Sequence, residues 1–161
     1  MKKLSRKHKI ALIELALVLL IALYFFAPRP FSLAMGSGFG REQVTQIQVD
    51  LTNYSGDGQP GRTLRLDPAD QGAQELLDRL EDKWYFPYYV EGDSRQITLD
   101  YAIQLTFSQP EGDYCCSLTG DRAIDMVDSA ARSRSYQVSG SEEFQRSLLD
   151  FLLQQEYTIQ E

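Results

Sequence analysis

The chain has 161 residues, of which 16 are lysine or arginine and 23 are aspartate or glutamate, so its formal net charge is −7. The asymmetry is larger beyond residue 27, where 11 basic residues stand against 22 acidic ones. Such an acidic segment excludes nucleic acid as an expected partner, because the phosphate backbone repels it. It is long enough for one domain with a hydrophobic core and too short for two.

The chain begins with a basic tip, residues 1–9, and continues with an apolar run, residues 10–27, of sequence IALIELALVLLIALYFFA. As a helix, this run would rise about 27 Å, close to the thickness of the hydrocarbon core of a bilayer. Basic residues before such a run keep that end in the cytoplasm, which predicts a single-pass cell-membrane protein whose remainder is extracytoplasmic. A cleaved signal peptide is the alternative, with residues 32–34 (Ser-Leu-Ala) as a small-residue cleavage site.

The apolar run contains one ionisable residue, Glu14, at its fifth position in the sequence IALIEL. Residues 10–24 thereby resemble the N-terminal segment of type IV pilins and pseudopilins, in which a glutamate at this position neutralises the N-terminal amine of the neighbouring subunit. The resemblance implies a minor pilin-like subunit that assembles through this helix. The chain differs from the family at Lys9, where the family's peptidase requires a small residue, and at Pro28 and Pro30, which stop the helix. A second interpretation is that Glu14 reaches back to the headgroups and the basic tip.

Residues 28–41 are rich in proline, glycine and serine and are predicted to be a linker that leads to a domain over residues 42–161. Alternating apolar residues from Val44 to Leu51 predict a half-buried strand, and turn residues at positions 53–61 predict a hairpin with a return strand at 62–66.

A helix is predicted next, with Asp67 as its N-cap and Pro68 at its first position. Its apolar stripe comprises Ala73, Leu76, Leu77, Leu80 and Trp84. Further strands are predicted at 97–107, 114–118, 123–127 and 135–138. A capping box at 139–142 begins a final helix, whose buried residues are Phe144, Leu148, Phe151 and Leu152.

This order of elements predicts an α+β fold: a transmembrane helix followed by a two-layer domain, in which an antiparallel sheet of about five or six strands is packed by two helices. Cys115 and Cys116 are adjacent in a predicted strand, so their side chains should lie on opposite faces, with Cys116 inward. Both are expected to be structural thiols.

The exported part contains no histidine, so Ser-His-Asp and Cys-His catalysis and histidine-bound zinc are not expected. The loop from Asn53 to Gly58 matches the first half of a calcium-binding loop, but Leu64 occupies the position of the bidentate glutamate. No metal, cofactor or enzymatic activity is therefore predicted. A small enzyme that uses two carboxylates is kept as an alternative.

The sequence WYFPYY at residues 84–89 concentrates five aromatic residues in six positions. Tyrosine and tryptophan are frequent at interaction hot spots, so the predicted binding surface consists of Trp84, Tyr85, Tyr88 and Tyr89. The alternative is that these aromatics close the hydrophobic core. We expect a membrane-anchored interaction module that binds a partner protein or a component of the cell envelope.

Overall fold

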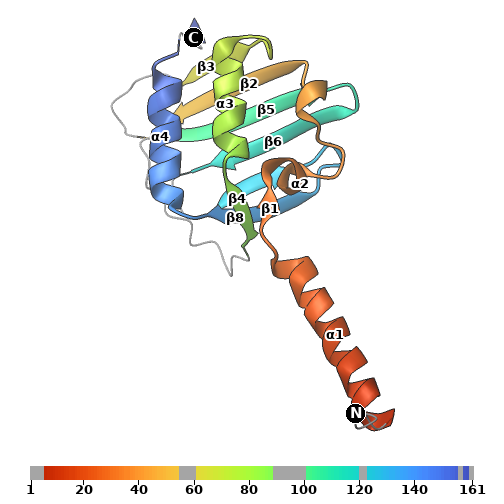
Figure 1. Ribbon diagram of the computed structural model, residues 1–161. Helices are drawn as coiled ribbons and strands as arrows, with labels where there is room; N and C mark the ends of the chain where they lie inside the picture. Colours follow the sequence, from red (N-terminus) through yellow and green to blue (C-terminus); the bar gives the residue numbers. More distant parts are fainter. Residues whose placement is uncertain (1–5, 55–60, 89–100, 120–122, 156–157, 160–161) are drawn as a thin grey trace.

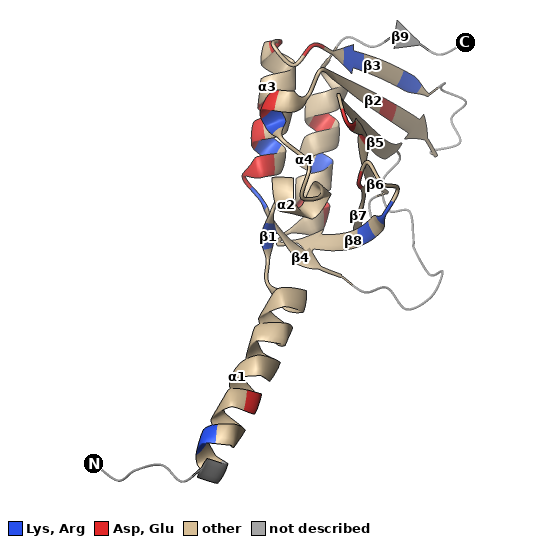
Figure 2. Cartoon of the chain, turned by 90° about the vertical axis from the view of Figure 1, so that its right-hand side faces the viewer, with Lys and Arg blue, Asp and Glu red and all other residues tan. Residues whose placement is uncertain are grey.

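The computed structural model describes residues 6–54, 61–88, 101–119, 123–155 and 158–159. Helix α1 projects from a domain in which helices lie against one face of a sheet (Figure 1). Seen from the side, the domain has two layers, with the helices in one layer and the strands in the other (Figure 2).

Helix α1 (Arg6–Phe26) is exposed along almost its whole length. In the described part of the chain, the stretch His8–Phe26 is the one helix long and apolar enough to cross a membrane, with 19 residues, a mean hydropathy of 2.4 and no residue buried in the structure. The helix ends just before Pro28, because the residue preceding a proline is disfavoured in the helical conformation. The apolar N-terminal helix predicted from the sequence is thus confirmed, although it begins at Arg6, inside the predicted basic tip, and ends at Phe26.

The domain is built on one sheet of nine strands among the described residues, in the order β1-β4-β8-β7-β6-β5-β2-β3-β9. Neighbouring strands are antiparallel throughout. The strands are β1 (Arg29–Pro30), β2 (Gln46–Asn53), β3 (Arg62–Leu66), β4 (Trp84–Pro87), β5 (Tyr101–Gln109), β6 (Gly112–Leu118), β7 (Ile124–Val127), β8 (Ser133–Val138) and β9 (Thr158–Ile159). The α+β class is confirmed. The number of strands exceeds the prediction, because β1, β4 and β9 are too short to show an alternating pattern in the sequence.

Side chains of the central strands alternate between buried and more exposed positions, as the sequence predicts. Ile47, Val49 and Leu51 of β2 are buried, and they pair with the equally buried Phe107, Leu105 and Ile103 of β5. In the next strand, Cys116 is buried and Cys115 is half-buried, and both are free thiols. The predicted strand residues 97–100 and the predicted turn residues 120–122 lie outside the described part of the chain.

Helices α3 (Gln71–Glu81) and α4 (Ser141–Leu153) cover the apolar face of the sheet. Their predicted buried stripes are confirmed, except that α3 ends before Trp84. Both predicted starts are wrong. Asp67 forms a tight turn in which its carboxylate accepts the Ala69 N–H, and Asp70 is the N-cap; α4 follows Gly140 in the left-handed conformation, with no capping bond from a side chain.

The segment predicted to be a linker, residues 28–41, belongs to the domain instead. It forms β1 and the short helix α2 (Phe31–Met35), which lies on the same face of the sheet as α3. Phe31 has an exposed fraction of 0%, and its ring contacts those of Phe39, Tyr85 and Phe107 at centroid distances of 5.4, 5.7 and 5.8 Å. The aromatic residues of this segment complete the hydrophobic core, and their burial orders the segment although it is rich in glycine, proline and serine.

Candidate functional site

The predicted aromatic surface lies on strand β4, where side chains alternate between two faces. Trp84 and Phe86 are 59% and 43% exposed, whereas Tyr85 is fully buried. The Tyr85 hydroxyl donates a hydrogen bond to the Leu80 carbonyl over 2.9 Å, and burial, with a smaller contribution from Cys116, raises the pKa of this phenol. Tyr85 is therefore a core residue, and its place in the predicted contact surface was wrong.

The other two predicted tyrosines add little to an exposed aromatic surface. Tyr88 is half-buried, and its backbone N–H bonds the Ser135 carbonyl at 2.9 Å, which extends the pairing of β4 with β8. Tyr89 lies outside the described residues. Among the described residues of this segment, the exposed aromatic pair is thus Trp84 and Phe86. Phe86 was not part of the predicted binding surface.

Next to this pair, a hollow of about 360 Å³ opens between the end of α3 and the beginning of α4. We call it the α3–α4 hollow. It is lined by Arg79, Asp82, Lys83, Ser139, Gly140, Glu143, Phe144, Ser147 and Leu148. The side chains of Phe144 and Leu148 are almost fully buried and form an apolar floor, whereas charged residues of both signs form the walls.

The basic wall of the hollow is held in place by contacts with both helices. The Arg79 guanidinium donates to the Glu75 carboxylate at 2.7 Å and lies 4.6 Å from the centre of the Phe151 ring. The Lys83 ammonium lies 5.9 Å from the centre of the Phe144 ring and 3.5 Å from the Asp82 carboxylate. Such stacking of cations on aromatic rings restricts their side chains in a half-exposed position.

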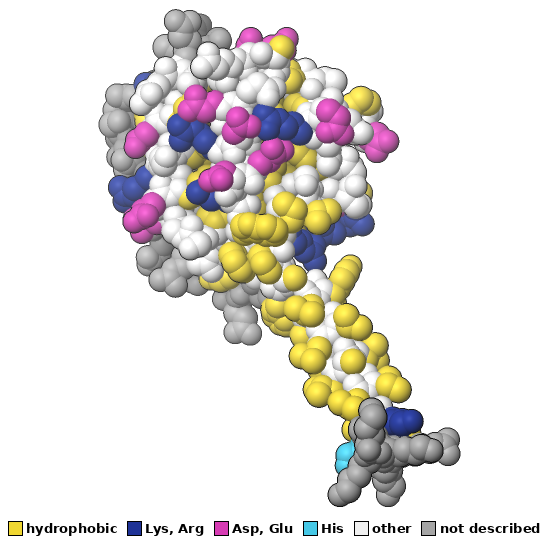
Figure 3. All heavy atoms as spheres, viewed as in Figure 1, with side chains coloured by type: hydrophobic (Ala, Val, Ile, Leu, Met, Phe, Trp, Pro, Cys, Tyr) yellow, Lys and Arg dark blue, Asp and Glu magenta, His cyan; other side chains and the backbone are white. Residues whose placement is uncertain are grey.

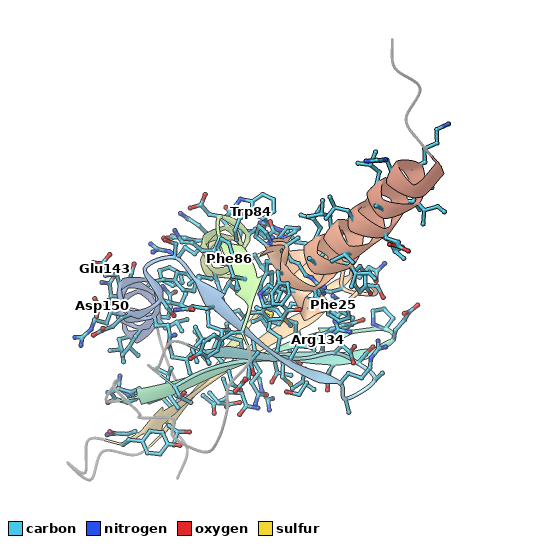
Figure 4. All side chains as sticks on the ribbon, turned by 90° about the horizontal axis from the view of Figure 1, so that it is seen from below. Phe25, Trp84, Phe86, Arg134, Glu143 and Asp150 are labelled. Carbon is cyan, nitrogen blue, oxygen red and sulfur yellow. The ribbon has the colours of Figure 1, made fainter. Side chains whose placement is uncertain are left out.

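Two further hollows continue from the first along the same end of the domain. One, of about 610 Å³, is lined by Phe86 and residues 137–143, and another, of about 600 Å³, by Trp84, Phe86, Lys83, Asp82, Pro28 and Ser139. All three share Ser139, in the turn between β8 and α4. Figure 4 shows Trp84 and Phe86 on one side of this turn and Glu143 and Asp150 on α4.

Asp128 is the described carboxyl group with a clearly shifted pKa. Its burial opposes ionisation, but hydrogen bonds from the Arg132 N–H, the Arg132 guanidinium and the Ala130 N–H outweigh this and lower its pKa. The Arg132 guanidinium neutralises Asp128, with a nitrogen–oxygen distance of 2.7 Å. These bonds close the loop between β7 and β8, so we assign Asp128 a structural role.

Among the described residues, no three histidine, cysteine, aspartate or glutamate side chains lie close enough to hold a metal ion. Most of the loop considered for calcium, residues 55–60, lies outside the described part of the chain. Comparison of the chain with models of protein families, with curated proteins and with solved structures finds no match.

Proposed function

We propose that this protein is a single-pass membrane-anchored binding module, with a cytoplasmic N-terminus and a domain outside the membrane that binds a partner protein. The length, hydropathy and exposure of α1 support the anchor. The basic residues of the tip support the orientation.

The observation that carries the binding proposal is the α3–α4 hollow, which combines a buried apolar floor with charged walls on an exposed helical surface. Pockets with this composition accept an apolar anchor from a partner while polar groups at the rim fix its orientation. The floor formed by Phe144 and Leu148 would contact such an anchor, and acidic rim residues such as Glu143 would contact its surroundings.

The charge of the surrounding surface indicates the partner's chemistry. Acidic side chains gather over α3 and α4 in Figure 3, and they are Glu75, Asp78, Glu81, Asp82, Glu142, Glu143 and Asp150. Basic residues are fewer on the same two helices, so the face is acidic. Complementary potentials speed association and select partners, so the expected partner presents a basic patch around an apolar side chain.

A photo-cross-linking experiment in native membranes tests the proposal. A benzophenone amino acid replaces Ser147, which is exposed at the hollow, or Gln104, which is exposed on the opposite face of the sheet. We expect a cross-linked partner from position 147 and none from position 104. Equal capture from both positions would show that the hollow is not the contact.

Two charge reversals on α4 provide a matched comparison, with the photo-cross-linker kept at position 147. Glu143 lines the hollow and Asp150 does not, although both are exposed on the same helix (Figure 4). Glu143→Lys should reduce the cross-link about five-fold or more, whereas Asp150→Lys should leave it unchanged, because specificity for a basic patch depends on the local charge. Both variants should unfold at the wild-type temperature. Equal effects of the two would contradict the proposed site.

A further inference from the structure

The domain is joined to α1 by a very short and structured connection. Helix α1 ends at Phe26 and β1 begins at Arg29, which pairs with Tyr85 while Pro30 pairs with Trp84. The next residue, Phe31, is fully buried in the core. The domain therefore cannot swing freely on a long tether, and β1 and β4 must remain near the end of α1.

Arg29 fixes a positive charge at this junction. Its guanidinium donates a hydrogen bond to the Tyr24 carbonyl over 3.2 Å and lies 5.9 Å from the centre of the Tyr24 ring. A cation is favourable there because the last carbonyls of a helix carry partial negative charge. If α1 spans the bilayer, this position is also the depth of the lipid phosphates.

The exposed aromatics of β4 follow at a depth that suits the membrane interface. From the register of β1 with β4, Phe86 is level with residue 28 and Trp84 with residue 30. At about 3.3 Å per residue, these positions lie at most about 7 and 13 Å beyond the end of α1. The headgroup layer is about 5–8 Å thick on each side of the hydrocarbon core, so the Phe86 backbone lies within it and the Trp84 backbone at most about 5–8 Å beyond it. Tryptophan is enriched at this interface.

Apolar and basic side chains gather on the same end of the domain. Leu33 of α2 is 55% exposed, and the apolar surface in Figure 3 continues from the base of the domain onto α1. Arg134 is exposed on β8, the strand next to β4. In Figure 2, basic residues appear on β1 and β8 near α1, whereas acidic residues predominate on α3 and α4.

From this arrangement we propose that the domain rests on the phospholipid headgroups of the bilayer that α1 crosses. The contact is a membrane-facing patch that consists of Trp84, Phe86, Leu33, Arg29 and Arg134. The aromatic and apolar side chains enter the interface and the two arginines bind lipid phosphates. The proposal rests on the membrane anchoring proposed above. A domain docked in this way would present the α3–α4 hollow to partners that lie along the membrane surface.

Trp84 is the only tryptophan of the chain, so the fluorescence of the unmodified protein reports on the patch. The full chain is reconstituted into phosphatidylcholine vesicles whose lipids are brominated near the top of their acyl chains. We expect the bromine atoms to reduce Trp84 emission to about half, as for a side chain at the interface, and aqueous iodide to quench it weakly. Strong quenching by iodide with none by brominated lipid would overturn the proposal.

Arg134→Gln should weaken quenching by the brominated lipid. Arg65→Gln, which removes the same charge from an exposed site on β3, should not. Equal behaviour of the two variants would contradict the role of Arg134. Emission that changes when the protein is diluted in lipid would show that a second copy covers Trp84, which also overturns the proposal.

Insertion of α1 is measured separately, by flotation of the protein with the vesicles after alkaline washing. Protein that floats without quenching by lipid refutes the docked domain alone. Protein that does not float refutes the anchor and the docking together.

Discussion

Two adjacent cysteines have different chemical surroundings because neighbouring residues of a strand face opposite ways. The side chain of Cys116 is fully buried, and its pKa is raised, first by burial and then by Asp125 and Cys115. Cys115 is half-buried, with its sulfur 3.8 Å from the Thr106 hydroxyl. A buried thiol with a raised pKa forms little thiolate and reacts slowly.

We predict that a thiol reagent modifies Cys115 in the folded protein and modifies Cys116 only after unfolding. Cys116→Ser should lower the free energy of unfolding by about 1–3 kcal/mol, because the hydroxyl is placed among apolar residues. Cys115→Ser should change it by less than about 0.5 kcal/mol. Urea unfolding measures both, and equal losses would contradict the assigned orientations.

The predicted binding surface was partly wrong because Trp84 and the residues after it form a strand and do not continue the helix. Helical spacing placed Trp84 on the buried stripe of α3, but the helix ends at Glu81 and the following residues pair with β8 and with β1. In a strand, Tyr85 takes the inward position and its neighbours point outward. The pairing of Trp84 with Pro30 joins segments far apart in sequence, and no local pattern shows it.

At the scale of elements, the strands with strong alternation were predictable, whereas short elements were not. The runs Ile47–Val49–Leu51 and Ile103–Leu105–Phe107 each carry their own period of two. Residues 31–39 contain two glycines and two serines between their apolar residues, so local composition suggests a linker. Only the sheet that Phe31 and Phe39 cover reveals their role.

The same separation in sequence hid the α3–α4 hollow. Arg79 and Lys83 come from the end of α3, Ser139 from a turn, and Glu143 from α4. None of these residues belongs to a recognisable motif. The left-handed Gly140 marks where the chain turns into α4, but a glycine in a turn does not by itself indicate a site.

The buried segment after α1 can be tested by substitution. Phe31→Ala should lower the free energy of unfolding by about 3–5 kcal/mol, because it leaves a cavity among Phe39, Tyr85 and Phe107. Leu33→Ala, two residues further along the exposed side of α2, should cost less than about 0.5 kcal/mol in detergent solution. Chemical denaturation of both variants checks this, and a small loss for Phe31→Ala would restore the interpretation of residues 28–41 as a linker.

In the whole molecule, the short junction holds the domain close to the end of α1. Arg29 bonds the last turn of α1, β1 pairs with β4, and Phe31 enters the core within five residues of the end of the helix. Arg41 also joins the segment after α2 to α3, since its guanidinium donates to Asp78 at 2.6 Å and to Glu81 at 2.8 Å. A module fixed in this way would present its acidic helical face in a defined direction.

Single-cysteine labelling can test whether α1 anchors the chain with its domain outside the cell membrane. In a chain with Cys115→Ser, where Cys116 is buried, a cysteine replaces either the exposed Gln104 of the domain or Ser5 of the tip. A membrane-impermeant maleimide is added to intact cells, or to spheroplasts where an outer membrane intervenes. We expect Gln104→Cys to be labelled at once and Ser5→Cys only after permeabilisation. Labelling of Gln104→Cys that requires permeabilisation would contradict the account.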